Sequence, residues 1–152
     1  MRAVVTQNID GLHQKAGSQV VYELHGSTLR NYCMECGKDF SMEYVLRADG
    51  GPHCDNCGGM VRPDVVLFGE GLDNDLLGAS IKAISSADTL IIGGTSLVVQ
   101  LAAGLVRYFR GQKLVMINKS ATAADEWADL VLHEPIGRTM ESVMAVMEET
   151  GY

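Results

Sequence analysis

The four cysteines of the chain form two pairs, each with two residues between its members. The first pair is Cys33 and Cys36, and the second is Cys54 and Cys57, with 17 residues between the pairs. Two intervening residues allow one tight turn to present both sulfurs to a single tetrahedral ion, and four thiolates fill the shell of that ion. The spacing therefore predicts one zinc ion per chain, held as a structural metal with no open position for catalysis.

Two alternatives to zinc are two disulfides or four unpaired thiols in the core. The regular pairing disfavours unpaired thiols, and a reducing compartment disfavours disulfides. We expect a cytoplasmic protein, because the chain shows no secretory leader and no apolar run long enough to cross a membrane. His53 adjoins Cys54, but four cysteines already fill the shell, so we expect this histidine to be a bystander.

The charge of the chain argues against a nucleic-acid partner. The 152 residues include 12 basic and 19 acidic ones, which gives a formal charge of −7. Zinc modules often bind nucleic acid, but between Cys33 and Arg62 five acidic residues outnumber three basic ones. That segment offers no basic face to displace counterions from phosphates, so we expect no nucleic-acid binding.

Outside the cysteine segment, short apolar runs alternate with amphipathic helical patterns. The expected strands are Arg2–Thr6, Val20–Leu24, Val65–Phe68, Thr89–Ile92, Leu114–Ile117 and Leu130–Leu132. The expected helices are Asn8–Ala16, Asn74–Ser86, one marked by Ala102, Leu105, Val106 and Phe109, and one marked by Met140, Val143, Met144 and Met147. This alternation predicts an α/β fold with a parallel sheet covered on both faces. The segment from Cys33 to Arg62, with Met42–Leu46 as its one helix, is expected to be an inserted module.

Polar residues follow three of the expected strands. They are Gln7 and Asn8, Thr95 and Ser96, and Asn118 and Lys119. Parallel sheets bind ligands at the carboxyl ends of their strands, which makes these residues candidates for a ligand site. Ordinary loop polarity is the alternative interpretation of each pair.

Several short motifs occur in a fixed order around the cysteine pairs. They are TQNIDGLH at Thr6–His13, ELHGS at Glu23–Ser27, RPDVVLFGE at Arg62–Glu70, GTSLVV at Gly94–Val99, and Ile117–Asn118. In this order the chain closely resembles the sirtuins, the NAD-dependent protein lysine deacylases, from Val4 to about Met147. Each motif is weak alone, and their joint order around a four-cysteine module is highly specific.

The resemblance implies a Rossmann-like domain with a small zinc module inserted in it. The domain would comprise residues 1–32 and 63–152, and the module residues 33–62. Sirtuins also have a glycine-rich strand–loop–helix that holds the NAD pyrophosphate, and no Gly-x-Gly-x-x-Gly stretch follows a strand in this chain. We therefore expect an incomplete parallel sheet that lacks the first βα unit, and a homo-oligomer or a complementing chain that covers the gap.

The resemblance also implies roles for residues of the cofactor site. His25 would be the general base that acts on a ribose hydroxyl of the NAD-derived intermediate. The residues that contact NAD itself would be Gln7, Asn8 and Asp10 around the nicotinamide and its ribose, Gly94, Thr95 and Ser96 under the phosphates and the adenosine ribose, and Asn118 at the adenosine end.

The substrate implied by the resemblance is an acylated lysine of a protein. The segment that lines the acyl-lysine tunnel and pairs with the peptide backbone would comprise Val65, Val66, Phe68, Gly69 and Glu70. The acyl oxygen would displace nicotinamide, and the products would be free lysine, nicotinamide and an O-acyl-ADP-ribose. We expect residues 1–152 alone to be inactive, and the alternative function is a non-catalytic zinc-containing remnant or peptide-binding module.

Overall fold

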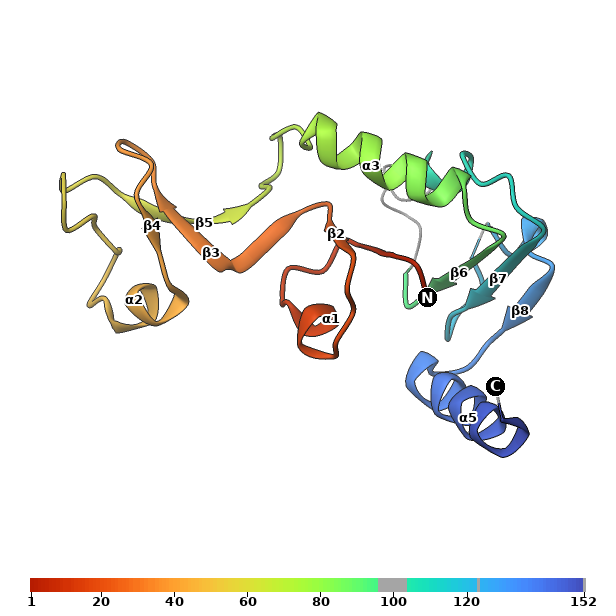
Figure 1. Ribbon diagram of the computed structural model, residues 1–152. Coiled ribbons are helices and arrows are strands. Elements are labelled where there is room, and N and C mark those ends of the chain that lie inside the picture. Colours follow the sequence, from red (N-terminus) through yellow and green to blue (C-terminus); the bar gives the residue numbers. More distant parts are fainter. Residues whose placement is uncertain (96–103, 123, 152) are drawn as a thin grey trace. The chain divides into compact units, whose positions relative to one another are not determined.

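A computed structural model describes residues 1–95, 104–122 and 124–151 of the chain (Figure 1). The chain divides into two compact units, residues 1–80 and 81–152. No helix within the described ranges is both long enough and apolar enough to span a membrane.

The first unit begins with a parallel pair of strands. β1 (Val4–Thr6) pairs with β2 (Val21–Glu23), and the short helix α1 (Leu12–Lys15) lies between them in the chain. The expected helix over Asn8–Ala16 is wrong in its first half, because that stretch is a loop held by hydrogen bonds. In this loop the Asn8 amide donates to Thr6 Oγ1 at 3.0 Å, and the Leu12 amide donates to Asp10 Oδ1 at 3.0 Å.

An antiparallel sheet of three strands follows in the order β4-β3-β5. Its strands are β3 (Gly26–Cys33), β4 (Asp39–Phe40) and β5 (Val61–Val65), and helix α2 (Met42–Arg47) follows β4. The strand predicted at Val65–Phe68 is thus displaced toward the N-terminus, and β3 was not predicted at all. A small core of Cys33, Phe40, Cys54 and Val61 lies against this sheet, with Tyr44 and Val45 packed on it.

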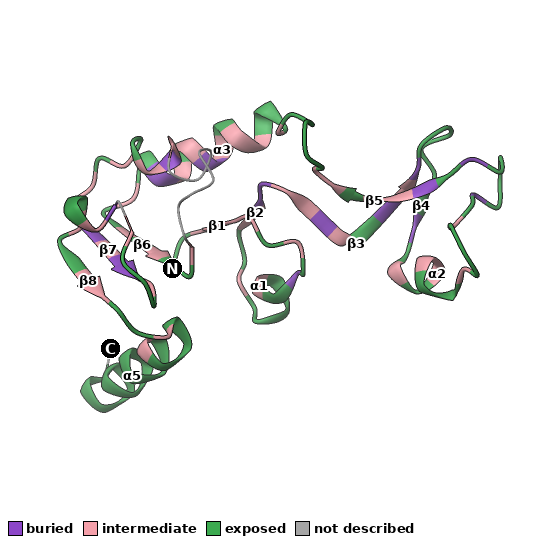
Figure 2. Cartoon of the chain, turned by 180° about the vertical axis from the view of Figure 1, so that it is seen from behind, coloured by how far each residue is buried: buried purple, intermediate pink, exposed green. Residues whose placement is uncertain are grey.

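The second unit contains the predicted parallel sheet, in the order β6-β7-β8. Its strands are β6 (Thr89–Gly93), β7 (Lys113–Ile117) and β8 (Leu130–Leu132), and helix α3 (Asn74–Ser85) precedes them. The apolar centre is β7, in which Leu114, Met116 and Ile117 are buried, as Figure 2 shows in purple. This arrangement confirms the α/β fold class with a parallel sheet.

Short and long helical segments accompany this sheet in the described part of the second unit. A single 3₁₀ turn (η1, Asp125–Trp127) precedes β8, and α5 (Ile136–Thr150) follows it. No residue of α5 is buried, and Met140, Val143, Met144 and Met147 all lie at its surface. Of the helix predicted around Ala102–Phe109, the described part shows only residues 104–106 as helical, and Ala102 lies outside the described residues.

A close backbone approach at Gly26 generates the first testable prediction. Gly26 has a φ of 75° and pairs with Val65, and an added Cβ would lie directly against the carbonyl of Asp64. Gly17 also has a positive φ, 91°, but a Cβ there meets nothing within 4 Å. Both Gly→Ala variants incur the left-handed backbone cost of about 1–2 kcal/mol. We expect G26A to lose about 1–3 kcal/mol more than G17A in urea unfolding, and equal losses would contradict the close approach.

Candidate active site and metal centre

The four cysteine sulfurs of the first unit converge on one point. Cys33 Sγ lies 3.5 Å from Cys57 Sγ, Cys36 Sγ lies 3.6 Å from Cys54 Sγ, and all four sulfurs lie within 4.8 Å of one another. Four sulfurs bound tetrahedrally at about 2.3 Å would be separated by about 3.8 Å. The group therefore fits one zinc ion, and none of the four cysteines is in a disulfide.

Two similar turns position these sulfurs. The Gly37 amide donates to Cys33 O at 3.0 Å, and the Gly58 amide donates to Cys54 O at 2.9 Å. Both glycines have a φ near 70–76°, which few other residues adopt. In each turn the first cysteine is buried and the second exposed. The backbone thus presents two sulfurs from each side, as the spacing predicts.

The pKa values of the two exposed thiols, Cys36 and Cys57, shift in opposite directions. A hydrogen bond from the backbone of Lys38 is the main cause that lowers the pKa of Cys36 to about 6. The backbone of Gly59 lowers the pKa of Cys57, but hydrogen bonds with Cys33 and Cys36 outweigh it and raise this pKa to about 12. Four crowded sulfurs cannot all ionise without a cation, and a bound divalent ion removes that restriction.

His53 lies beside the metal group but is not a member of it. Its Nδ1 is 3.1 Å from the carbonyl oxygen of Gly58, and its own carbonyl accepts a hydrogen bond from the Tyr44 hydroxyl at 2.7 Å. These contacts tie His53 to the backbone around the cysteine group.

The carboxyl ends of β1 and β2 bring two predicted site segments together. Thr6 pairs with Glu23 in the parallel register, and the Leu24 amide donates to Thr6 O at 2.9 Å. Gln7 directly follows β1, and His25 follows β2 after one residue. The two segments therefore leave the same edge of the same strand pair, where ligands of parallel sheets bind.

The loop after β1 is fixed by its neighbours, yet one buried side-chain nitrogen in it has no hydrogen-bond partner among the described residues. Ile9 O accepts hydrogen bonds from the backbone amide and the hydroxyl of Thr28, each at 3.0 Å. Asp10 Oδ1 accepts a hydrogen bond from the Leu12 amide at the start of α1. Gln7 Nε2 is buried and has no hydrogen-bond partner within the described part of the chain. A buried, unpaired donor is rare and indicates a site that something else completes.

His25 connects β2 to the segment predicted to bind substrate. Its carbonyl accepts a hydrogen bond from the Val66 amide at 3.0 Å, and the next residue, Gly26, pairs with Val65. The His25 side chain is half-buried. The structure thus places the predicted base directly beside Val65 and Val66.

The remaining predicted substrate residues lie in the turn after β5. Phe68 is fully exposed, and Gly69 has a φ of 89°. Glu70 forms an ion pair with Arg62, with Oε1 2.8 Å from Nη1. The hydrogen bond from Arg62, followed by one from the Leu67 amide, lowers the pKa of Glu70 to about 2. The stabilisation from this pair is complete above the ordinary pKa near 4.5 and is lost as the pH falls through about 2.

Two further predicted cofactor residues meet at the carboxyl ends of β6 and β7, in the second unit. The Gly94 amide donates to Ile117 O at 3.1 Å, and the Asn118 amide donates to Leu132 O at 3.0 Å. Asn118 Nδ2 also donates to Ser120 O at 2.8 Å. Thr95 is half-buried and follows Gly94, and Ser96 lies outside the described residues. The predicted NAD residues are thus distributed over both units.

Sequence reasoning missed a charged connection that supports the site in the first unit. Arg30 Nη1 lies 2.8 Å from Glu23 Oε2, and Arg30 Nε lies 3.0 Å from Asp64 Oδ2. Glu23 is buried and lies two residues before His25, while Asp64 directly precedes Val65. The acidic residues were visible within two motifs, but their partner Arg30 belongs to a strand that the sequence did not predict.

The metal group generates the second prediction. We expect one zinc per purified chain, and we expect Cys33→Ala to lose the metal and to unfold residues 33–62, because the ion supplies much of their folding free energy. His53→Ala is the matched control and retains a full equivalent of zinc. Elemental analysis and circular dichroism measure both effects. Well under one equivalent of zinc in the unaltered protein would refute the prediction.

Comparison with known proteins agrees with the order of motifs. The sequence model of the Sir2 family matches residues 1–101. The NAD-dependent protein deacetylase of Clostridium acetobutylicum is 63% identical over 145 residues, which are 95% of this chain and 59% of the relative. The corresponding protein of Clostridium perfringens is 57% identical over the same shares. The chain thus spans less than two thirds of the length of these relatives.

Solved structures show the same fold. A Sir2 homologue in complex with NAD superposes with a TM-score of 0.88 at 37% identity, over 99% of this chain and 59% of the homologue. Sir2 bound to a p53 peptide and NAD⁺ gives a TM-score of 0.83 at 40% identity, over 99% of this chain and 64% of that protein. The ordered motifs, the four-cysteine group and these similarities lead to one conclusion: the chain belongs to the Sir2 family.

Proposed function

We propose that this chain provides the zinc module, the peptide-binding segment and part of the cofactor site of an NAD-dependent protein lysine deacylase. The observation that carries the proposal is the buried, unpaired Nε2 of Gln7, in the loop that leaves the same strand edge as His25. A donor left in this state costs about 1–3 kcal/mol unless a ligand satisfies it. The nicotinamide end of NAD offers carbonyl and hydroxyl acceptors of suitable size.

The names of the relatives support this proposal. The matched proteins of both Clostridium species are NAD-dependent protein deacetylases, and the solved relatives hold NAD or a p53 peptide. NAD, when bound, supplies the bond to nicotinamide that the reaction breaks. Gln7, Asn8 and Asp10 would hold its nicotinamide end.

The adenosine end of NAD is assigned to the second unit. Gly94, Thr95, Ser96 and Asn118 would contact the phosphates and the adenosine. Gly94 and Asn118 lie at the carboxyl ends of neighbouring strands, and a glycine without a side chain allows close approach of a phosphate. The zinc takes no part in the chemistry, because four cysteines leave it no open position.

His25 would accept the proton of a ribose hydroxyl during acyl transfer. An imidazole suits this task at neutral pH. Next to it, Val65, Val66 and Phe68 would provide apolar contacts for the stem of an acylated lysine, and the backbone around Gly69 would pair with the substrate peptide. The substrate is therefore an acylated lysine within a protein, and the reduced thiols of the metal group suit a cytoplasmic location.

A second candidate function is a peptide-binding module without catalysis. The observation that favours it is that the four cysteines and the segment of residues 65–70 lie together in the first compact unit, whereas Gly94 and Asn118 lie in the second. Such a module would keep the zinc and the peptide segment but would not turn over NAD. NAD binding distinguishes the two functions.

The third prediction tests the role of His25. In a form that also carries the glycine-rich segment of the family, we expect His25→Ala to reduce deacylation by about 10²–10⁴-fold while peptide binding persists. His13→Gln, on α1, is the control. We expect its rate to stay within about tenfold of the unaltered rate, which corresponds to about 1.4 kcal/mol. Nicotinamide release from NAD and an acetylated peptide measures the rate. Near-normal turnover of His25→Ala would show that His25 is not the base.

The fourth prediction concerns residues 1–152 alone. We expect weak NAD binding and no deacylation, because the described loops offer contacts to the two ends of NAD but no helix N-terminus for its pyrophosphate. Incubation with NAD and an acetylated peptide tests this expectation. Nicotinamide release at enzyme-like rates would refute it.

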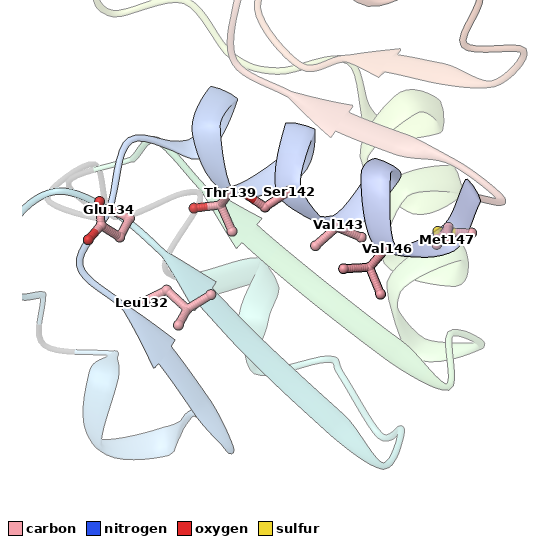
Figure 3. A pocket seen from close by; sticks show the side chains of 7 residues that line it. All are labelled: Leu132, Glu134, Thr139, Ser142, Val143, Val146 and Met147. Carbon is pink, nitrogen blue, oxygen red and sulfur yellow. The ribbon is translucent and has the colours of Figure 1, made fainter. Parts of the chain in front are cut away.

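The exposed face of α5 generates the fifth prediction. An open groove of about 450 Å³ lies along it, lined mainly by Leu132, Val143, Val146 and Met147 (Figure 3). Apolar patches above a few hundred Å² tend to drive association, so we expect residues 1–152 to form a homo-oligomer or to require a complementing chain. Light scattering should show association that Val143→Glu reduces and Glu141→Gln leaves unchanged. A monodisperse monomer at high concentration would contradict the prediction.

A further inference from the structure

Arg62 and Glu70 make a set of contacts that no sequence motif explains by itself. Arg62 Nη1 and Nη2 donate to Glu70 Oε1 and Oε2 at 2.8 and 3.2 Å, which is a two-pronged ion pair. Arg62 Nη2 also donates to Val65 O at 2.8 Å, and the Leu67 amide donates to Glu70 Oε2 at 2.8 Å. The pair thus binds the backbone on both sides of Val66.

These contacts lie along the edge of the segment that faces away from β3. The Val66 amide donates to His25 O, so Val66 faces β3. Backbone groups alternate in direction along a strand, and therefore Val65 and Leu67 face the opposite edge. A peptide that adds to this edge as a strand needs free donors and acceptors there. Arg62 and Glu70 already occupy Val65 O and the Leu67 amide.

The backbone groups of the turn after Leu67 differ from those at Val65 and Leu67, which the ion pair occupies. Leu67 O accepts a hydrogen bond from the Glu70 amide at 3.0 Å, which closes a tight turn. Within the described ranges, the amide and carbonyl groups of Phe68 and Gly69 form no backbone hydrogen bond, and the Phe68 side chain is fully exposed. The turn therefore projects Phe68 and Gly69 while the ion pair covers the two preceding positions.

We propose that Arg62 and Glu70 act as one positioning unit that closes the edge at Val65 and Leu67 and holds Phe68 and Gly69 in place to pair with the acylated peptide. The inference rests on the proposed function and deepens it. It also changes the role of Glu70, which we predicted as a substrate-binding residue: Glu70 acts on the peptide through Arg62 and the Leu67 amide and does not touch it.

A double-mutant cycle on residues 1–152 tests this role. The probe is a fluorescent acetyl-lysine peptide, and the readout is its Kd by anisotropy. We expect Arg62→Gln and Glu70→Gln each to weaken binding about tenfold and the double variant to weaken it by the same factor, because each change removes the same unit. Arg62→Lys keeps the charge but not the two-pronged geometry. Its Kd should therefore lie between the Kd of the unaltered chain and that of Arg62→Gln. Lys113→Gln, which breaks the exposed pair with Asp129, is the control and leaves Kd unchanged.

Amide hydrogen exchange separates positioning of the turn from general stability. In both single variants the Leu67 amide should exchange faster, while the Val66 amide, which is bonded to His25, keeps its protection. Loss of protection at Val66 as well would show that the Arg62–Glu70 pair stabilises the whole pairing of β3 with β5, and would overturn the proposal.

Three binding results would also overturn it. Losses that add to about a hundredfold in the double variant would mean that Glu70 contacts the peptide on its own. Tighter binding by the single variants would mean that the ion pair competes with the peptide. A failure of the unaltered chain to bind the peptide, with Leu67 exchanging as described, would refute the proposed peptide site and this role with it, whereas additive losses would leave the proposed function intact.

Discussion

The antiparallel pairing of β3 with β5 is the constraint on which the first unit depends. β3 begins at Gly26, directly after His25, and ends at Cys33, a member of the metal group. Its eight residues span about 26 Å when extended. At one end Cys33 pairs with Val61, and at the other Gly26 pairs with Val65. A metal bound by Cys33 would hold one end of this pairing, while the other end sets His25 beside Val65 and Val66.

A bulge in β3 interrupts the pairing of β3 with β5 between Ser27 and Asn31. Ser27 pairs with Asp64 and Asn31 with Pro63, so three residues of β3 bulge from the register. Pro63 has no amide hydrogen to donate, so the interrupted pairing loses no hydrogen bond from that amide. The bulged residues carry the tertiary contacts: Thr28 binds Ile9 O, and Arg30 binds Glu23 and Asp64. One irregularity thus connects the loop after β1, the strand before His25 and β5.

The sequence predicted the features that depend on local spacing. The cysteine pairs, the parallel sheet of the second unit and α3 all follow from patterns within a few residues. It did not predict β3, since Gly26–Cys33 is mostly polar and owes its extended form to β4 and β5. It also placed a strand at Val65–Phe68, where the apolar run is real but the ion pair of residues eight positions apart ends the strand at Val65. Such contacts between residues separated in the sequence produce no periodic pattern from which they could be predicted.

Arg30 and Arg62 connect separate segments of the first unit. The side chains of Arg30 and Asp64 are each about half exposed, at 55% and 51%, and such exposed ion pairs are worth about 0–1 kcal/mol. Their value lies in what they connect, because each arginine joins a carboxylate from a different segment to β3 or β5. Arg30 reaches back to the strand before His25, and Arg62 reaches forward to the turn after Val65. His25 and the turn after Val65 are therefore held from both sides by contacts that can be altered without removing the core of Cys33, Phe40, Cys54 and Val61.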